Sequence, residues 1–173
     1  VRLVGSEMCI RDSAKAKGKM IIADPKRADI SVYSGVNLLT PNLAELQNTT
    51  DQILNSIEAI GQAATTLAKE FGIGSILTTM SARGMMLSKA DGTQFHDPAS
   101  ARDIFDVSGA GDTVVAMIAG ALVAGADLED AIRLANHAAS VAVGKSGTAI
   151  VAPGEVLAHL AGTPPPTDWP RIA

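Results

Sequence analysis

Residues 106–113, DVSGAGDT, combine residue types that can hold an anion and move a proton. The apolar run 104–107 predicts a strand, and the small and apolar residues from about 112 to 124 predict a helix. A glycine-rich turn between a strand and a helix presents unpaired backbone N–H groups at the positive end of the helix, where anions bind. We therefore expect an anion hole formed by Gly109, Ala110 and Gly111, whose glycines let the backbone approach the anion.

Asp112 is the candidate general base of this segment. It lies in the first turn of the predicted helix, where the helix dipole favours an ionised carboxylate that can take a proton from an alcohol. The motif alone leaves a second interpretation open. In that interpretation Asp112 only complements the dipole, and the glycines only make a tight turn between strand and helix.

Two better-known glycine motifs do not fit the sequence. A dinucleotide fingerprint requires G-x-G-x-x-G, but Val114 stands in place of the third glycine, and the acid about 20 residues further on, Glu129, falls in a predicted helix. A phosphate-cradling P-loop requires G-x-x-x-x-G-K-[ST]. Residues 144–146, GKS, supply only its second half, because Ala139 replaces the first glycine, and they follow a predicted helix instead of preceding one.

Strand and helix signals alternate along the chain, which predicts an α/β fold. Short apolar runs closed by Pro25 and Pro41 predict buried strands, and Asp91-Gly92 between two apolar runs predicts a hairpin. The predicted strands cover residues 19–23, 36–39, 75–79, 85–87, 93–95 and 104–107. The predicted helices cover residues 56–71, about 112–124, a segment capped by Asp127 with its buried stripe at 128–143, and 153–161.

Composition narrows the class of protein. Of the 173 residues, 47% are hydrophobic and 18% charged, which suits a packed core and argues against disorder. The net charge of -4 offers no basic surface, so neither nucleic acid nor a membrane is an expected partner. The single cysteine, Cys9, excludes an internal disulfide, and His96 and His159 lack an acidic or cysteine partner at metal-ligand spacing. Because the longest apolar run, 114–126, is too short to span a bilayer, we expect a cytoplasmic protein.

The segment 106–113 closely resembles the D-[TV]-x-G-A-G-D signature of the ribokinase-like (PfkB) carbohydrate kinases. Three further segments resemble elements of that family in the same order: TPNLAE at 40–45, TTMSARGM at 78–85 and LANHAASVAVGKSGTA at 134–149. The resemblance extends over about residues 19–161. It implies the C-terminal portion of a ribokinase-like, doubly wound α/β sandwich that binds the nucleotide.

The resemblance implies a role for each candidate residue. Asp112 corresponds to the catalytic base of the family, the amides of residues 109–111 to its anion hole, and Glu45 to the acid that organises magnesium through its water shell. It implies ATP and Mg2+, together with a monovalent cation near Asp106 and the loop 146–147. The implied ATP-binding residues are Asn42, Leu43, Ala44, Glu45, Thr79, Gly84 and Asn136.

Several of these residues also have an ordinary structural interpretation. Asn42 and Glu45 fit a helix N-cap and its first-turn acid, although their place after a strand end and ahead of GAGD favours the nucleotide interpretation. Thr79 and Gly84 fit a simple hairpin. Asn136 fits a hydrogen bond within an alanine-rich helix, and for this residue the structural interpretation is slightly favoured.

The two ends of the chain stand apart from this pattern. Residues 1–13, VRLVGSEMCIRDS, show no strand or helix period and resemble translated sequencing-adapter sequence, so we expect a non-native segment. Residues 14–162 are expected to be the C-terminal, nucleotide-binding part of a carbohydrate kinase domain. The proline-rich residues 163–173 are expected to be a tail or linker.

Within the family, the segments LLTPNLAE, DVSGAGDTV and LANHAASVAVGKSGTAIV resemble the kinases of D-glycero-β-D-manno-heptose 7-phosphate. That resemblance implies transfer of the γ-phosphoryl group of ATP to the anomeric hydroxyl of this sugar phosphate, a step of ADP-heptose synthesis for the lipopolysaccharide core. The alternatives are a kinase of another sugar or nucleoside, or a non-catalytic nucleotide-binding fragment. The N-terminal half of the family, which carries most sugar contacts, has no counterpart here, so we expect this chain alone to be inactive. A homodimer of the full-length protein is compatible with the family.

Overall fold

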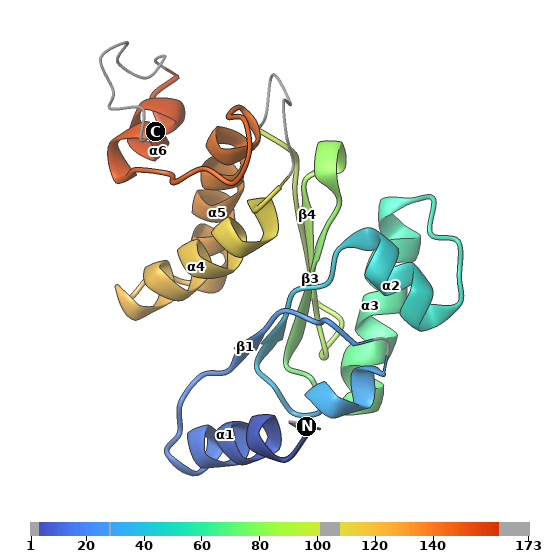
Figure 1. Ribbon diagram of the computed structural model, residues 1–173. Coiled ribbons are helices and arrows are strands. Elements are labelled where there is room, and N and C mark those ends of the chain that lie inside the picture. Colours follow the sequence, from blue (N-terminus) through green and yellow to red (C-terminus); the bar gives the residue numbers. More distant parts are fainter. Residues whose placement is uncertain (1–3, 28, 101–107, 163–173) are drawn as a thin grey trace. The chain divides into compact units, whose positions relative to one another are not determined.

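The computed structural model describes residues 4–27, 29–100 and 108–162 (Figure 1). Strands and helices alternate along the chain, as the sequence predicts for an α/β fold, and they form two compact units, Val1–His96 and Asp97–Ala173. Within the described ranges, no helix is long and apolar enough to cross a membrane. The predictions for the strand 104–107, for Asp106 and for the tail 163–173 lie outside the described residues.

The first unit is built around a five-stranded sheet with the strand order β1-β2-β3-β4-β5. The first three strands run parallel, so their carboxyl ends lie at the same end of the sheet, whereas β4 runs antiparallel to β3. In α/β sheets, ligands bind outside the carboxyl ends of the parallel strands. The strands are β1 (Ile22–Ala23), β2 (Leu38–Leu39), β3 (Ser75–Thr79), β4 (Met85–Lys89) and β5 (Gln94–Asp97).

β1 and β2 are shorter than the predicted strands 19–23 and 36–39. The backbone N–H of Ile21 donates to the side-chain Oδ1 of Asn37 at 2.8 Å, and Ile21 O accepts from the N–H groups of Asn37 and Leu38. A side-chain amide thus replaces a backbone partner beside the short parallel ladder. An apolar run locates a buried strand, but it contains no information on where a side chain takes the place of a backbone partner and so limits the ladder.

Two helices, α2 (Leu43–Thr50) and α3 (Ile57–Phe71), cover one face of this sheet (Figure 1). The Ser56 side chain caps the start of α3, and Gly72 ends the helix in the left-handed conformation. The apolar positions of α3 bury their side chains in the core, as Ile60 does with 0% exposure. Burial of such a side chain contributes about 1.5–3 kcal/mol to the free energy of folding. Because this contribution is large, a stripe of apolar residues at helical spacing predicts α3.

The N-terminal residues form a helix that the sequence analysis does not predict. α1 spans Val4–Ala16, although residues 1–13 show no apolar period. A polar contact ties it to the unit: the guanidinium of Arg11 donates to Val32 O at 3.1 Å, within the 3-10 helix η1 (Ile30–Tyr33). Residues 4–13 thus belong to a regular element, while the origin of the segment 1–13 stays a prediction.

The second unit contains three helices in its described residues. Two of them, α4 and α5, pack along each other (Figure 1), and half of their buried positions are alanines, whose small side chains let the backbones approach closely. Asp127 caps α5 as predicted, with its Oδ1 accepting the N–H of Asp130 at 2.8 Å. The helices are α4 (Ala110–Val123), α5 (Leu128–Val143) and α6 (Pro153–Leu160), so α4 begins at Ala110 and not at the predicted Asp112.

Candidate functional site

The glycine turn forms the start of α4 in the second unit. Gly109 is the N-cap, with φ 77° and ψ −1°, and its O accepts the N–H of Thr113 at 3.0 Å, which starts the helical hydrogen bonds. A side chain of the N-cap residue caps three helices, from Asn42 in α2, Ser56 in α3 and Asp127 in α5. α6 has no such bond from its N-cap Ala152, and in α4 the N-cap is a glycine, which has no side chain to offer. The first-turn N–H groups of α4 therefore have the arrangement that suits an anion.

The two glycines of this turn have different surroundings. A Cβ on Gly109 would lie 3.1 Å from Cγ2 of Thr148, and the positive φ is itself unfavourable for other residues, so the fold requires glycine here. A Cβ on Gly111 would have no described atom within 4 Å, and Gly111 lies inside the helix. The described residues therefore leave room for a side chain at position 111.

Asp112 lies in the first turn of α4 and is exposed to solvent. A carboxylate beside an anion hole can accept a proton from a hydroxyl that attacks the bound group. The structure thus places the predicted base and the predicted anion hole on one helix start, which follows from their adjacency in the chain. Their roles in chemistry stay predictions.

In the first unit, Asn42 and Glu45 form a reciprocal capping box at the start of α2. Asn42 Oδ1 accepts the N–H of Glu45 at 2.9 Å, and Glu45 Oε2 accepts the N–H of Asn42 at 2.8 Å. Leu43 and Ala44 lie between them, ahead of the first helical hydrogen bond from Leu46 to Asn42 O. The capping interpretation of N-x-x-E is therefore correct. It is compatible with a second role, because a carboxylate has about four acceptor sites.

The structure places the turn from Thr79 to Gly84 beside the start of α2. Thr79 pairs with Asn42 in an isolated parallel bridge, and its N–H donates to Pro41 O at 3.0 Å. Gly84 ends the turn with φ 82° and ψ −139°, and its O accepts the N–H of Met80 at 2.8 Å. The hairpin interpretation is thus correct as well. The same geometry brings Thr79 and Asn42 together at the carboxyl ends of the parallel strands, where a ligand is expected.

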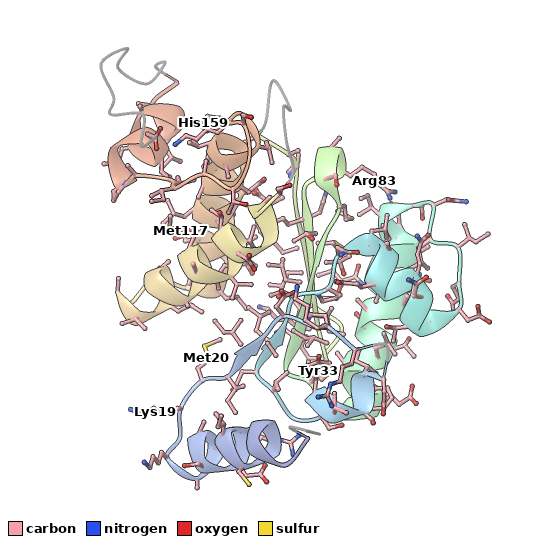
Figure 2. All side chains as sticks on the ribbon, viewed as in Figure 1. Lys19, Met20, Tyr33, Arg83, Met117 and His159 are labelled. Carbon is pink, nitrogen blue, oxygen red and sulfur yellow. The ribbon has the colours of Figure 1, made fainter. Side chains whose placement is uncertain are left out.

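Arg83 fixes this turn to the helices that cover the sheet. Its guanidinium donates to Asn55 O at 3.3 Å, and Figure 2 shows Arg83 pointing from the turn toward the connection between α2 and α3. On β5, His96 Nε2 lies 2.8 Å from Arg83 O. The turn is therefore held from two directions.

Asn136 is buried in α5, and its amide group is engaged in the fold. Its Nδ2 donates to Asp97 Oδ2 at 2.6 Å and to Pro98 O at 2.7 Å, so both amide hydrogens have partners. These bonds attach the residues at the end of β5 to α5. The amide of Asn136 thus has a structural role, but its bonds reach outside α5 and do not lie within the helix as the structural interpretation predicts. A contact of Asn136 with ATP stays a prediction.

Residues 6–154 match the pfkB family of carbohydrate kinases. The chain belongs to this family. The matched range includes every candidate site residue of this pfkB chain, and it begins inside the segment 1–13. The family resemblance carried by the sequence motifs is thereby confirmed.

Two curated relatives of this pfkB chain carry the same name. The Bifunctional protein HldE of Paramagnetospirillum magneticum is 48% identical over 147 residues, and that of Halorhodospira halophila is 46% identical over 155 residues. These alignments cover 85% and 90% of this chain, but 30% and 32% of the two relatives. The chain thus spans just under a third of the length of the curated relatives that it matches.

Solved structures have the same fold. Ribokinase of Arabidopsis thaliana, complexed with ribose and ATP, matches with a TM-score of 0.74 and 25% identity, over 84% of this chain and 48% of its own. Phosphofructokinase-2 of Escherichia coli, in complex with potassium, matches with a TM-score of 0.80 and 20% identity, over 94% of this chain and 53% of its own. The predicted ribokinase-like α/β fold is confirmed.

The family resemblance implies magnesium, and the carboxylate of Glu45 in this pfkB chain suits the way in which proteins bind this ion. In the ranges that the structure describes, no group of three or more His, Cys, Asp and Glu side chains is placed to hold a metal ion. Mg2+ usually keeps several waters and binds through one or two carboxylates together with substrate phosphates. Glu45 suits that mode, because the capping box fixes its carboxylate and leaves further acceptor sites.

The sequence analysis misses the contacts of the loop after α5. Lys145 enters it only as part of an incomplete P-loop, yet its Nζ donates to Ile150 O and to Glu155 Oε2, both at 2.7 Å. One signal exists for Glu155, because a proline at the first position of a helix followed two residues later by glutamate predicts a capping glutamate. No local pattern pairs that glutamate with Lys145.

Proposed function

We propose that the whole protein is an ATP-dependent sugar kinase whose acceptor is D-glycero-β-D-manno-heptose 7-phosphate. The γ-phosphoryl group of ATP passes to the anomeric hydroxyl, which yields the 1,7-bisphosphate and ADP for ADP-heptose and lipopolysaccharide core synthesis. Membership of the pfkB family supports the kinase class. The resemblance of LLTPNLAE and DVSGAGDTV to heptose 7-phosphate kinases, and the name HldE of the two curated relatives described above, support the acceptor.

The start of α4 supplies the chemical step of this proposal. Asp112 accepts the proton of the sugar hydroxyl while the hydroxyl oxygen forms a bond to the γ-phosphorus. The bond between that phosphorus and the β–γ bridging oxygen breaks, and ADP leaves with the electron pair. Negative charge spreads over the transferring group, where the amides of residues 109–111 stabilise it.

The start of α2 and the adjoining turn supply nucleotide binding in the same proposal. The N–H groups of Leu43 and Ala44 lie at a helix start, beside Thr79. Glu45 holds water of the magnesium shell, and the magnesium supplies positive charge that neutralises the nucleotide phosphates. Phosphoryl transfer relies mainly on such positioning and charge stabilisation, so few side chains are needed.

The start of α4, whose N-cap is a glycine, is the observation that carries the proposal. Gly109 has no side chain that could accept a first-turn N–H, whereas Asp127 accepts one in α5. Gly111 leaves open space among the described atoms where a side chain would begin. A phosphoryl group would fill that space and accept those hydrogen bonds.

The substitution Asp112→Asn in the whole protein tests the proposed base. We expect kcat to fall by about 10²–10⁴-fold, because an amide cannot accept the proton, while ATP binding changes little because the backbone amides remain. Initial rates of ADP release and calorimetric titration with ATP measure the two effects. Asp130→Asn makes the same change in the first turn of α5 and should leave the rate unchanged. Retention of more than about a tenth of kcat in Asp112→Asn contradicts the assignment.

A further inference from the structure

One buried carboxylate closes the loop between α5 and α6. Glu155 is 5% exposed, and its Oε2 accepts from the N–H of Ala152 at 2.8 Å and from Nζ of Lys145 at 2.7 Å. The same ammonium group donates to Ile150 O at 2.7 Å. One pair of side chains thus ties together three points of the loop: Lys145, two residues after the end of α5, then Ile150, and Ala152, directly before α6.

This loop lies against the glycine turn of α4. Thr148 lies in the chain between Lys145 and Ile150, which are joined by a hydrogen bond. If Gly109 carried a Cβ, that atom would be 3.1 Å from Cγ2 of Thr148. Figure 1 shows the connection from α5 to α6 passing beside the start of α4. Because the side chain of Thr148 lies directly beside Gly109, the position of the loop limits the position of Gly109 and of the amides that follow it.

The two charges depend on each other more than an exposed pair would. The side chain of Glu155 is only 6% exposed, so its carboxylate has lost most of its hydration, and charged hydrogen bonds replace it. Loss of the lysine would leave a buried charge with a single backbone donor among the contacts described here. The pair Arg133–Asp130 on α5 has side chains 49% and 63% exposed, and water replaces either partner there.

The packing of α6 on α5 has a second contact. His137 of α5 lies against His159 of α6, which is labelled in Figure 2, and their Nδ1 atoms are 2.9 Å apart. The two helices therefore stay joined when the lysine and glutamate pair is altered. Substitutions in the pair are expected to loosen the loop without separating the helices.

We propose that Lys145 and Glu155 are positioning residues for phosphoryl transfer, which keep the loop 146–150 against Gly109 and so hold the first-turn amides of α4 in a fixed orientation. The inference rests on the proposed function. Both residues act through Thr148 and Gly109, and neither is a catalytic residue. Charge stabilisation requires donors that are fixed before the reaction, and a displacement of about 1 Å can cost about 100-fold in rate.

Two variants of the whole protein test this role. Glu155→Gln keeps an oxygen for the N–H of Ala152 but removes the charge, and Lys145→Met keeps an aliphatic stem without the ammonium group. We expect each to lower kcat by about 10–100-fold with an unchanged KM for the sugar. Amide hydrogen exchange should become faster at residues 146–150 and 109–111 together. Lys145→Arg, which retains a cation with several donors, should restore kcat. The double variant, with both substitutions, should have a kcat no lower than that of the less active single variant.

Arg133→Met is the matched control, because it breaks an exposed ion pair on the same helix, and it should leave kcat and exchange unchanged. Faster exchange at 146–150 with an unchanged kcat would overturn the proposal and leave the pair a purely structural contact. Unchanged exchange at 146–150 would overturn it as well, since the pair would not hold the loop. Absence of sugar-dependent ADP release in the unaltered protein would defeat the proposed function instead. In that case amide hydrogen exchange at residues 109–111 still tests the structural part of the inference. Faster exchange there in Glu155→Gln or Lys145→Met supports it, and unchanged exchange overturns it.

Discussion

Glu45 combines a structural contact with a proposed chemical one. Its Oε2 accepts the N–H of Asn42 in the capping box, and its remaining acceptor sites are those proposed to hold magnesium-bound water. The cap requires an acceptor oxygen, whereas the proposed action on magnesium requires negative charge. A substitution that keeps the oxygen and removes the charge therefore separates the two roles.

We expect Glu45→Gln to raise the magnesium concentration for half-maximal rate and to lower kcat by about 10–1,000-fold, because a neutral amide attracts the magnesium shell less strongly. The melting temperature should change little, since the amide oxygen still accepts the N–H of Asn42. Magnesium titrations of the initial rate and thermal melts provide the readouts. Glu58→Gln, in the first turn of α3, is the matched control. An unchanged magnesium titration would leave Glu45 with its capping role alone.

The two glycines of the α4 turn provide a matched pair of substitutions. Gly109→Ala places a Cβ 3.1 Å from Thr148 on a residue with positive φ, so we expect the free energy of unfolding to fall by about 1 kcal/mol or more. Gly111→Ala meets no described atom and should leave stability unchanged or raise it by up to about 1 kcal/mol. Its kcat should nevertheless fall, because the Cβ occupies space proposed for the phosphoryl group. Denaturant unfolding and initial rates measure both, and a fully active Gly111→Ala variant contradicts the proposed anion position.

The sequence predicts the local part of the candidate site and misses the contacts that support it. DVSGAGDT is contiguous, so the helix start and its exposed aspartate follow from the pattern of residues 106–113. The bonds from Lys145 to Glu155 and from Asn136 to Asp97 join residues 10 and 39 positions apart. Periodicity and motif spacing describe neighbours along the chain, and they contain no information on such pairs.

At the scale of elements, apolar stripes predict helices better than apolar runs predict strands. α3 and α5 each combine a buried stripe with a capping side chain, and both follow from the sequence. The ends of β1 and β2 depend on the Asn37 side chain, which replaces a backbone partner. For α1, the contact from Arg11 to Val32 O is polar, and residues 1–13 show no apolar period from which the helix could be predicted.

Two buried hydroxyls on the sheet lead to a prediction about β3 and β4. Thr78 Oγ1 and Ser88 Oγ have no hydrogen-bond partner among the described residues. The register pairs Thr78 with Met86 and Ile76 with Ser88, so both hydroxyls share a face with the core residues Ile76 and Met86. An unpaired buried hydroxyl costs about 1–3 kcal/mol, so we expect Thr78→Val to raise the free energy of unfolding by about 1 kcal/mol.

Denaturant unfolding with an unchanged m-value measures the effect of Thr78→Val. Thr66→Val, on the exposed side of α3, is the control and should change the free energy of unfolding by less than about 0.5 kcal/mol. Destabilisation by Thr78→Val would show that the hydroxyl is satisfied in solution.

At the scale of the molecule, each compact unit carries its own candidate residues. Val1–His96 contains the capping box of α2 and the turn after β3, and Asp97–Ala173 contains the glycine turn with Asp112. The pfkB match extends over residues 6–154 and so includes both sets. Because the chain spans 30% and 32% of two curated relatives, the proposed activity is tested on the whole protein.

The central claim is tested most directly by the acceptor dependence of ADP release from the whole protein. With ATP and magnesium, we predict release that depends on D-glycero-β-D-manno-heptose 7-phosphate, and phosphorus NMR should show a new phosphate on the anomeric oxygen. Fructose and ribose serve as comparison acceptors and should give the background rate. Release with fructose or ribose but not with the heptose phosphate would contradict the proposed acceptor, and no sugar-dependent release with any of the three would contradict the kinase itself.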